Sequence, residues 1–299
     1  MSGSTLVSSR FEMAQQAAPS RFHHLTSGLR RLARNRMALI GLIVLIAGVL
    51  VAAFAPWIAP YDPKKIAVID ALQGPSRQHW MGTDNLGRDL LSRVIYGIRT
   101  SMLIAVISIS VAGSIGVTLG LISGFYGRRV DDIIMRAMDI LYAFPDLLIA
   151  LALVATFGTG FWSLVVAIAI GRIPGFARIT RASVLSIREN EYVEAARTIG
   201  SGNRRIVLRH ILPNGLAPII VMTSVSLALA ILVEASLSFL GLGIQPPTPS
   251  LGALLKDSLG FMETAPWLAI FPGVTIALII FALNLLGDGL RDLLDPKLK

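Results

Sequence analysis

Six stretches of the chain are long and apolar enough to cross a lipid bilayer as helices. A helix rises about 1.5 Å per residue, so about 20 mostly apolar residues are needed to span about 30 Å of hydrocarbon. The stretches of suitable length are 37–57, 100–127, 137–157, 162–178, 214–240 and 266–287. The pattern therefore predicts an all-α integral membrane protein with six transmembrane helices.

The first stretch could also belong to a cleaved signal peptide, because Ala53-Phe54-Ala55 resembles a cleavage site. Its apolar run is longer than that of an ordinary signal peptide, and Pro56 would follow the scissile bond. We therefore interpret 37–57 as a retained first transmembrane helix.

Small residues recur every four positions in the second stretch. They are Ala112, Gly116, Gly120 and Gly124. Small side chains at this spacing let two membrane helices approach closely. We expect a packing seam rather than a pore lining, and we favour a seam inside the subunit over one against a partner.

The charges fall unevenly between the loops. Charged residues make up 15% of the chain, against about 25% in an average soluble domain, and the net charge is +9. With both termini in the cytoplasm, 20 of the 27 lysines and arginines lie inside and 7 outside, as the positive-inside rule requires. Nucleic-acid binding is not expected, because no basic segment carries stacking aromatics. This orientation makes 1–36 a cytoplasmic N-terminal arm, 58–98 a periplasmic loop and 289–299 a cytoplasmic tail.

The periplasmic loop 58–98 contains an amphipathic pattern of its own. Thr83 or Asp84 can cap a helix with leucines and branched residues on one side. On that helix Asp89 and Arg93 would pair at i, i+4. The helix could be a packing elbow or could help to receive a partner protein.

A charged stretch, 186–213, separates the fourth and fifth spans on the cytoplasmic side. It predicts a helix that ends at Gly200, where a left-handed cap would stand. Asn203 can then N-cap a second short helix, which Pro213 would end. By spacing alone this pair is either a docking element or a solvated connector.

The same stretch resembles the EAA motif of ABC importer permeases. The matching residues are Glu194-Ala195-Ala196, Gly200 and Leu212-Pro213, while His210 stands where the broad consensus has isoleucine. In that family the loop is a coupling helix that docks on the ATPase subunit. The resemblance implies that ATPase coupling is carried by Glu191, Glu194, Ala195, Ala196, Gly200, Leu212 and Pro213.

Three further segments, 81–101, 234–252 and 287–299, resemble the C-type permease subunit of dipeptide and oligopeptide importers. The resemblance implies a six-helix type I transmembrane domain over 99–288, in a multi-pass protein of the inner membrane. It implies as partners a second permease subunit, two ABC ATPase subunits and an extracytoplasmic peptide-binding protein, in contact with membrane lipid. Peptides are the implied substrates, with nickel, glutathione or another small solute as alternatives.

Five charged residues inside the apolar stretches are candidates for the translocation path or its gate. They are Asp139, Asp146, Arg172, Arg178 and Glu234. A charge in the bilayer costs about 2.5–3.5 kcal/mol on insertion scales, so it usually faces a cavity or a partner. A structural ion pair would explain each candidate equally well. Glu234 ranks first, because a glycine- and proline-rich segment that could form an outer gate follows it.

Catalytic chemistry is not expected on this chain. The sequence contains no phosphate loop of the form GxxxxGK[ST], so we expect ATP and Mg²⁺ to bind the partner ATPase subunits. The four histidines show no metal-ligand spacing, and the absence of cysteine excludes disulfides. We therefore expect no cofactor or metal here. A secondary transporter or a membrane scaffold remains a less favoured alternative.

Overall fold

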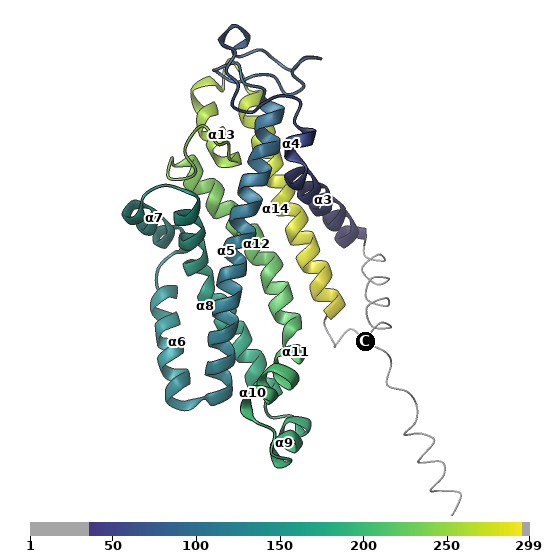
Figure 1. The fold of residues 1–299 in the computed structure, drawn as a ribbon, viewed down its shortest axis with the longest axis vertical. Helices are drawn as coiled ribbons and strands as arrows, with labels where there is room; N and C mark the ends of the chain where they lie inside the picture. The colour runs from purple at the N-terminus through teal and green to yellow at the C-terminus, as the bar shows by residue number, and fades with distance from the viewer. Residues whose placement is uncertain (1–35, 295–299) are drawn as a thin grey trace, which may run out of the picture.

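The structure of the protein is a computed structural model that describes residues 36–294. Within that range the chain forms helices joined by turns and loops, with no β-strand (Figure 1). The expected N-terminal arm therefore lies outside the described residues except for Arg36, as do residues 295–299 of the expected tail. The all-α membrane architecture is confirmed.

Five helices are long and apolar enough to span a membrane. They are α3 (Arg36–Ala53), α5 (Leu90–Tyr126), α8 (Phe161–Ile187), α12 (Leu216–Phe239) and α14 (Trp267–Leu294). They cover the expected first, second, fourth, fifth and sixth stretches. Several extend past the apolar run that predicted them, because charged turns continue the helix beyond the hydrocarbon.

The third expected span, 137–157, is not one helix. The chain instead forms α6 (Arg128–Tyr142) and α7 (Asp146–Phe157), which are bent by 84° at the break between them. The break follows from Pro145, which has an extended backbone and precedes the first turn of α7. A proline also disfavours helical geometry in the residue before it, so Phe144 cannot continue α6 regularly.

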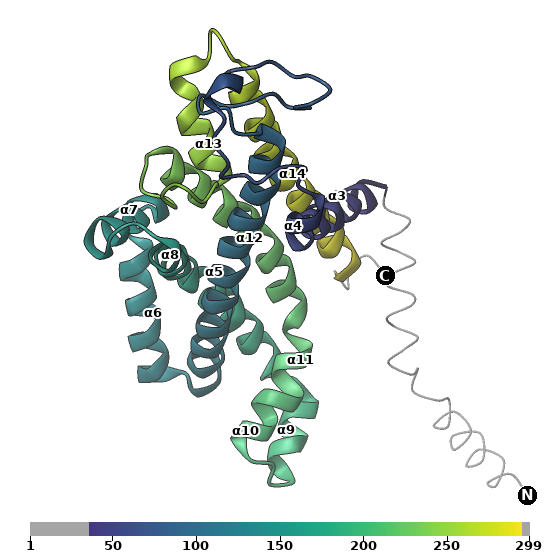
Figure 2. The same ribbon diagram turned by 45° about the horizontal axis from the view of Figure 1, so that its top comes forward.

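The long helices are arranged around α5, which runs most of the length of the molecule (Figure 1). The most extensive contact is between α5 and α8, and α14 packs against both α3 and α12 (Figure 2). One end of the bundle carries α9 (Glu191–Thr198), and the opposite end carries α13 (Leu251–Ser258). We refer to these as the α9 end and the α13 end.

The α5–α8 contact depends on the small-residue seam. A Cβ atom on Gly116 would lie 2.6 Å from the carbonyl oxygen of Ile173, and one on Gly120 would lie 2.5 Å from that of Ala177. At Gly124 it would meet Val184 at 2.7 Å. Ala112 on the same face is fully buried. The structure thus places the seam inside the subunit.

The start of α5 corrects the expectation of a separate amphipathic helix in 58–98. The helix pattern belongs to the first turns of α5, which is N-capped by Asp89 rather than by Thr83 or Asp84. The Asp89 side chain accepts a hydrogen bond from the backbone N–H of Ser92 at 2.8 Å. Helix α4 (Ala55–Ile58) precedes the loop, and the rest of the loop contains one 3₁₀ turn, Val68–Asp70. The apolar boundary near residue 100 is therefore not a helix boundary.

Candidate functional site

The 186–213 loop folds as a compact unit at the α9 end. Helix α9 buries Val193 and Ala196, which are three residues apart and share one face. They join a small apolar cluster with Ile206 and Ile211 of the following segment and with Leu121 and Val184 of the bundle. This cluster fixes α9 to the ends of α5 and α8.

A glycine turn ends α9. Gly200 has a φ of +81°, in the left-handed region that its sequence context predicted. Its N–H donates to the carbonyl of Arg197 at 2.9 Å, and the N–H of Ser201 donates to Ala196 at 3.0 Å. This pair of bonds is a Schellman motif, which satisfies carbonyls that the helix end leaves free. The turn reverses the direction of the chain, and no other part of the described chain packs over Gly200.

The second half of the loop departs from the expected short α-helix. Gly202, not Asn203, stands at the N-cap of α10 (Asn203–Ile206), and a π-helical segment, Val207–Ile211, follows it. Pro213 does not end the helix but lies in the first turn of α11 (Leu212–Asn214). A π turn brings residues five apart to one face. Ile206 and Ile211 are therefore both buried. His210, which stands where the consensus has isoleucine, is only half-buried.

The opposite face of the loop is open. Glu191, Glu194, Ala195 and Pro213 are exposed and Leu212 is half-buried. Large apolar side chains are also exposed to solvent there, because Ile199 is 81% exposed and Leu208 is 50% exposed. Acidic, small and apolar groups together form a surface suited to a protein partner rather than to a small ligand.

Two arginines that sequence reasoning used only for topology, Arg188 in the loop and Arg181 in α8 just before it, contact other parts of the bundle. Arg188 donates a hydrogen bond from its guanidinium to the carbonyl of Gly124 at 2.8 Å. Arg181 makes two bonds of 2.5 Å to the carboxylate of Asp131, which also accepts one from Ser123. Bidentate pairs of this kind fix geometry as well as charge. The two partners of each contact are far apart in the sequence, so no local pattern predicted these contacts.

Four of the intramembrane charges form two ion pairs beside the α6–α7 break. Asp139 pairs with Arg178 at 2.5 Å, and Asp146 pairs with Arg172 at 2.7 Å. The Arg178 guanidinium also lies 4.3 Å from the ring centroid of Tyr142. Both pairs keep part of their surface open. Each pair joins α8 to the bent segment, so they can stabilise the bend and still present charge to a path.

Glu234 does not lie where the sequence suggested. Its side chain is fully enclosed, so in this chain it does not open to a path. One carboxylate oxygen accepts a bond of 2.7 Å from Ser238, and the hydroxyls of Ser101 and Ser250 face the same group. The other oxygen has no hydrogen-bond partner among residues 36–294.

The enclosure of Glu234 has a physical cause in the packing of α13 onto α12. A Cβ atom on Gly252 would lie 2.3 Å from the carbonyl oxygen of Ala235, so only glycine allows this approach. Gly243 packs equally closely on Ser238. The glycine-rich segment expected to form a gate thus closes over the carboxyl group and joins α5, α12 and α13.

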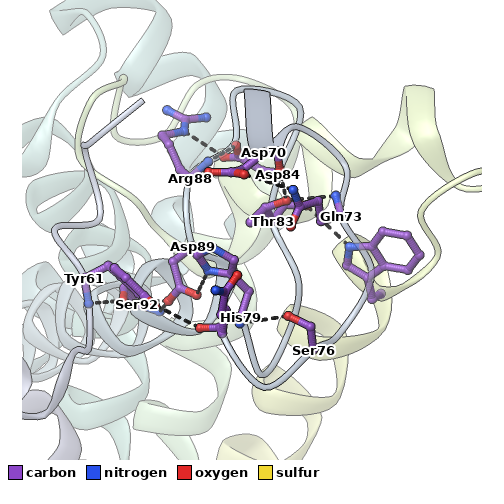
Figure 3. A network of polar contacts seen from close by, with 12 residues as sticks. Tyr61, Asp70, Gln73, Ser76, His79, Thr83, Asp84, Arg88, Asp89 and Ser92 are labelled. Atoms are coloured by element: carbon purple, nitrogen blue, oxygen red, sulfur yellow. Dashed lines mark hydrogen bonds and ion pairs between the residues drawn. The ribbon is translucent and has the colours of Figure 1, made fainter. Parts of the chain in front are cut away.

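A buried polar network organises the loop at the α13 end (Figure 3). The Asp84 carboxylate accepts bonds from two backbone N–H groups, from Arg88 at 2.7 Å and from Arg93. Asp89 binds His79 at 2.9 Å. The expected Asp89–Arg93 pair is therefore wrong: Arg93 pairs with Asp84 and with Asp257 beyond it. The network holds a loop with little apolar core in one conformation.

Comparison with known proteins gives the same architecture. Residues 116–299 match the family described as binding-protein-dependent transport system inner membrane component. Residues 26–75 match the N-terminal transmembrane domain of oligopeptide transport permease C. A chain of the methionine ABC transporter MetNI in inward-facing conformations has a TM-score of 0.56 at 15% identity, covering 69% of this chain and 98% of that one.

Relatives of known name align over nearly the whole length. A dipeptide transport system permease protein of Alkalihalophilus pseudofirmus is 45% identical, over 90% of this chain and 89% of its own. A di/tripeptide transport system permease protein of Pseudomonas aeruginosa is 46% identical, over 89% and 90%. A glutathione transport system permease protein of Pectobacterium atrosepticum is also 46% identical, over 90% of each chain.

Proposed function

The chain belongs to the family of binding-protein-dependent transport system inner membrane components, and from that premise we propose that it is one of two non-identical permease subunits of an ATP-driven peptide importer. Dipeptides and short oligopeptides are the proposed substrates. The names of the dipeptide and di/tripeptide relatives support this substrate class. Glutathione, itself a tripeptide, is the second candidate, because an equally similar relative carries that name. Nickel and other small solutes are less favoured.

The open surface of the 186–213 loop is the observation that carries the proposal. It projects past the ends of the long helices (Figure 1), and its exposed residues include Glu191, Glu194 and Ala195. We propose that this surface is the coupling loop that docks on one of two ABC ATPase subunits, which bind ATP and Mg²⁺. This chain would transmit work and perform no catalysis.

The proposed transport cycle requires the complex to open to one side at a time. Shifting a two-state equilibrium from 1:99 to 99:1 takes about 5.5 kcal/mol of differential binding. Closure of the ATPases on ATP can supply this through the coupling loop. The Arg188–Gly124 contact joins that loop to α5, and Arg181 of α8, just before the loop, binds Asp131 of α6, so a displacement of the loop would reach the membrane helices.

The experiment that tests the function uses the complete complex. We expect two ATPase subunits and a second permease to co-purify with this chain, and we expect vesicles with the complex to take up a labelled dipeptide when ATP and the binding protein are present. Glutathione and nickel uptake are measured in parallel. Uptake driven by an ion gradient without ATPases would support a secondary transporter, and assembly without any uptake would support a scaffold; either result contradicts the proposal.

The proposed orientation places both termini and the α9 end in the cytoplasm and the α13 end outside. Ile69 near the α13 end is 98% exposed, and Asn203 is exposed on the coupling loop. The chain has no native cysteine, so single Ile69→Cys and Asn203→Cys variants report without background. An impermeant thiol reagent applied to spheroplasts should label the first and reach the second only after lysis. Labelling of Asn203→Cys in intact spheroplasts would reverse the topology.

A further inference from the structure

An open crevice of about 250 Å³ lies between α3 and α5 near the α13 end. Arg99 stands in it, together with an apolar lining of Val49, Ala52, Ala53, Met102, Leu103 and Val106. Val49, Leu103 and Val106 are each nearly half exposed. The described part of the chain therefore leaves the crevice open on its outer side.

The polar and apolar parts of the crevice are ordered along the helices. Arg99 is the last charge of α5, because residues 100–126 carry none. From Arg99 the lining continues for two turns, about 10 Å, through Leu103 to Val106. Trp57, just beyond the end of α3, is 78% exposed, as is typical of a side chain at a membrane interface. Arg99 thus marks the level of the lipid headgroups, and the apolar lining runs from it toward the membrane interior.

Arg99 is a cation without a counterion. Its side chain is half-buried, yet it forms no hydrogen bond or ion pair with any residue between 36 and 294. The preceding arginine of α5, Arg93, has two carboxylate partners. A guanidinium beside an apolar wall is stabilised by a phosphate, which accepts charge-assisted and often bidentate hydrogen bonds.

We infer that this crevice binds a membrane phospholipid, whose phosphate pairs with Arg99 and whose acyl chain lies between α3 and α5. An anionic headgroup such as phosphatidylglycerol fits better than zwitterionic phosphatidylcholine, because nothing acidic lines the crevice. Bound lipid would fill the gap at the α3–α5 contact. The inference is independent of the transported solute.

The test is native mass spectrometry of the purified complete complex, titrated with phosphatidylglycerol or phosphatidylcholine. We expect one phosphatidylglycerol per copy of this chain to bind preferentially. Arg99→Ala should weaken that binding about tenfold, the loss expected for one charge-assisted contact. Ala52→Phe, which keeps the arginine and fills the crevice, should also weaken it. Equal binding by wild type and both variants would overturn the inference.

Arg77 offers a matched control. It is an exposed arginine near the same end of the molecule, also without an ion pair among the described residues, and it lines a separate pocket with Tyr61 and Trp80 rather than this crevice. Arg77→Ala should keep the wild-type affinity for phosphatidylglycerol. If it weakened binding as much as Arg99→Ala, the effect would come from the general positive charge of the surface, which would overturn the inference. A photo-crosslinker at Leu103 should capture lipid. Capture of the second permease instead would show that a protein covers the crevice and would also overturn the inference.

Discussion

Replacing Gly120 with alanine is expected to lower the yield of folded protein and to destabilise what remains by about 1–3 kcal/mol, the usual cost of overpacking. The new Cβ atom would lie 2.5 Å from the carbonyl oxygen of Ala177 and 2.7 Å from the Cβ of Thr180. Neither atom can move without separating α5 from α8. Gly116→Ala should behave in the same way, because it meets the carbonyl oxygen of Ile173. Thermal unfolding of the purified complex in detergent measures the effect.

Gly113 on the same helix provides the control for this prediction. A Cβ atom there would be 3.8 Å from the ring of Phe176, an ordinary contact. Alanine is favoured over glycine in a helix by about 1 kcal/mol, so Gly113→Ala should keep or raise the unfolding midpoint. A midpoint for Gly120→Ala as high as that of Gly113→Ala would show that the seam is looser than the structure indicates.

Replacing Gly200 with valine is expected to abolish solute uptake while leaving membrane insertion intact. The backbone at Gly200 has a φ of +81°, which a β-branched residue adopts only with strain of about 1–3 kcal/mol. No atom lies within 4 Å of the added Cβ, so the effect would come from the turn itself. Opening the turn should displace α9 and its exposed surface. Uptake by whole cells, set against the amount of complex in the membrane, measures the loss.

Gly202 separates the turn from simple bulk at the surface. It too has nothing within 4 Å of a new Cβ atom, but its φ of −65° suits any residue. Gly202→Val should therefore retain most of the uptake. If both variants lost uptake equally, the cause would be contact with the partner and not the left-handed turn.

Hydropathy predicted the membrane helices well because a span must be apolar over most of its length. It failed at 137–157, where the apolar run continues across Phe144 and Pro145 although the helix axis turns by 84°. It also placed the start of the second span near residue 100, since the charge of Arg93 interrupts the apolar run, although α5 begins at Leu90 and Arg93 is buried in it against Asp84. A charged residue that is neutralised by a tertiary ion pair can be buried, although hydropathy places it at the surface.

The site residues divide in the same way. Gly200 was predicted from a local requirement, a helix end that needs a left-handed residue, and the structure places it in that conformation. The partners of Arg93, Arg181 and Arg188 lie on other elements, so no spacing rule could identify them. Glu234 was interpreted as a gate residue from the glycine- and proline-rich segment that follows it, but close packing at Gly243 of that segment and at Gly252 of α13 encloses it instead.

The π-helical segment Val207–Ile211 makes the orientation of the 186–213 loop depend on the number of residues in it. Each residue of an α-helix advances the chain by about 100°, so the extra residue in the π turn sets the rotational phase between Ile206 and the Leu212-Pro213 entry to α12. Deleting the exposed Arg209 would relax the segment to an α-helix and leave the buried Ile206 and Ile211 in place. The exposed face of α9 would then be rotated about the axis of α12. Such a one-residue deletion would change the direction in which the exposed surface of the loop points.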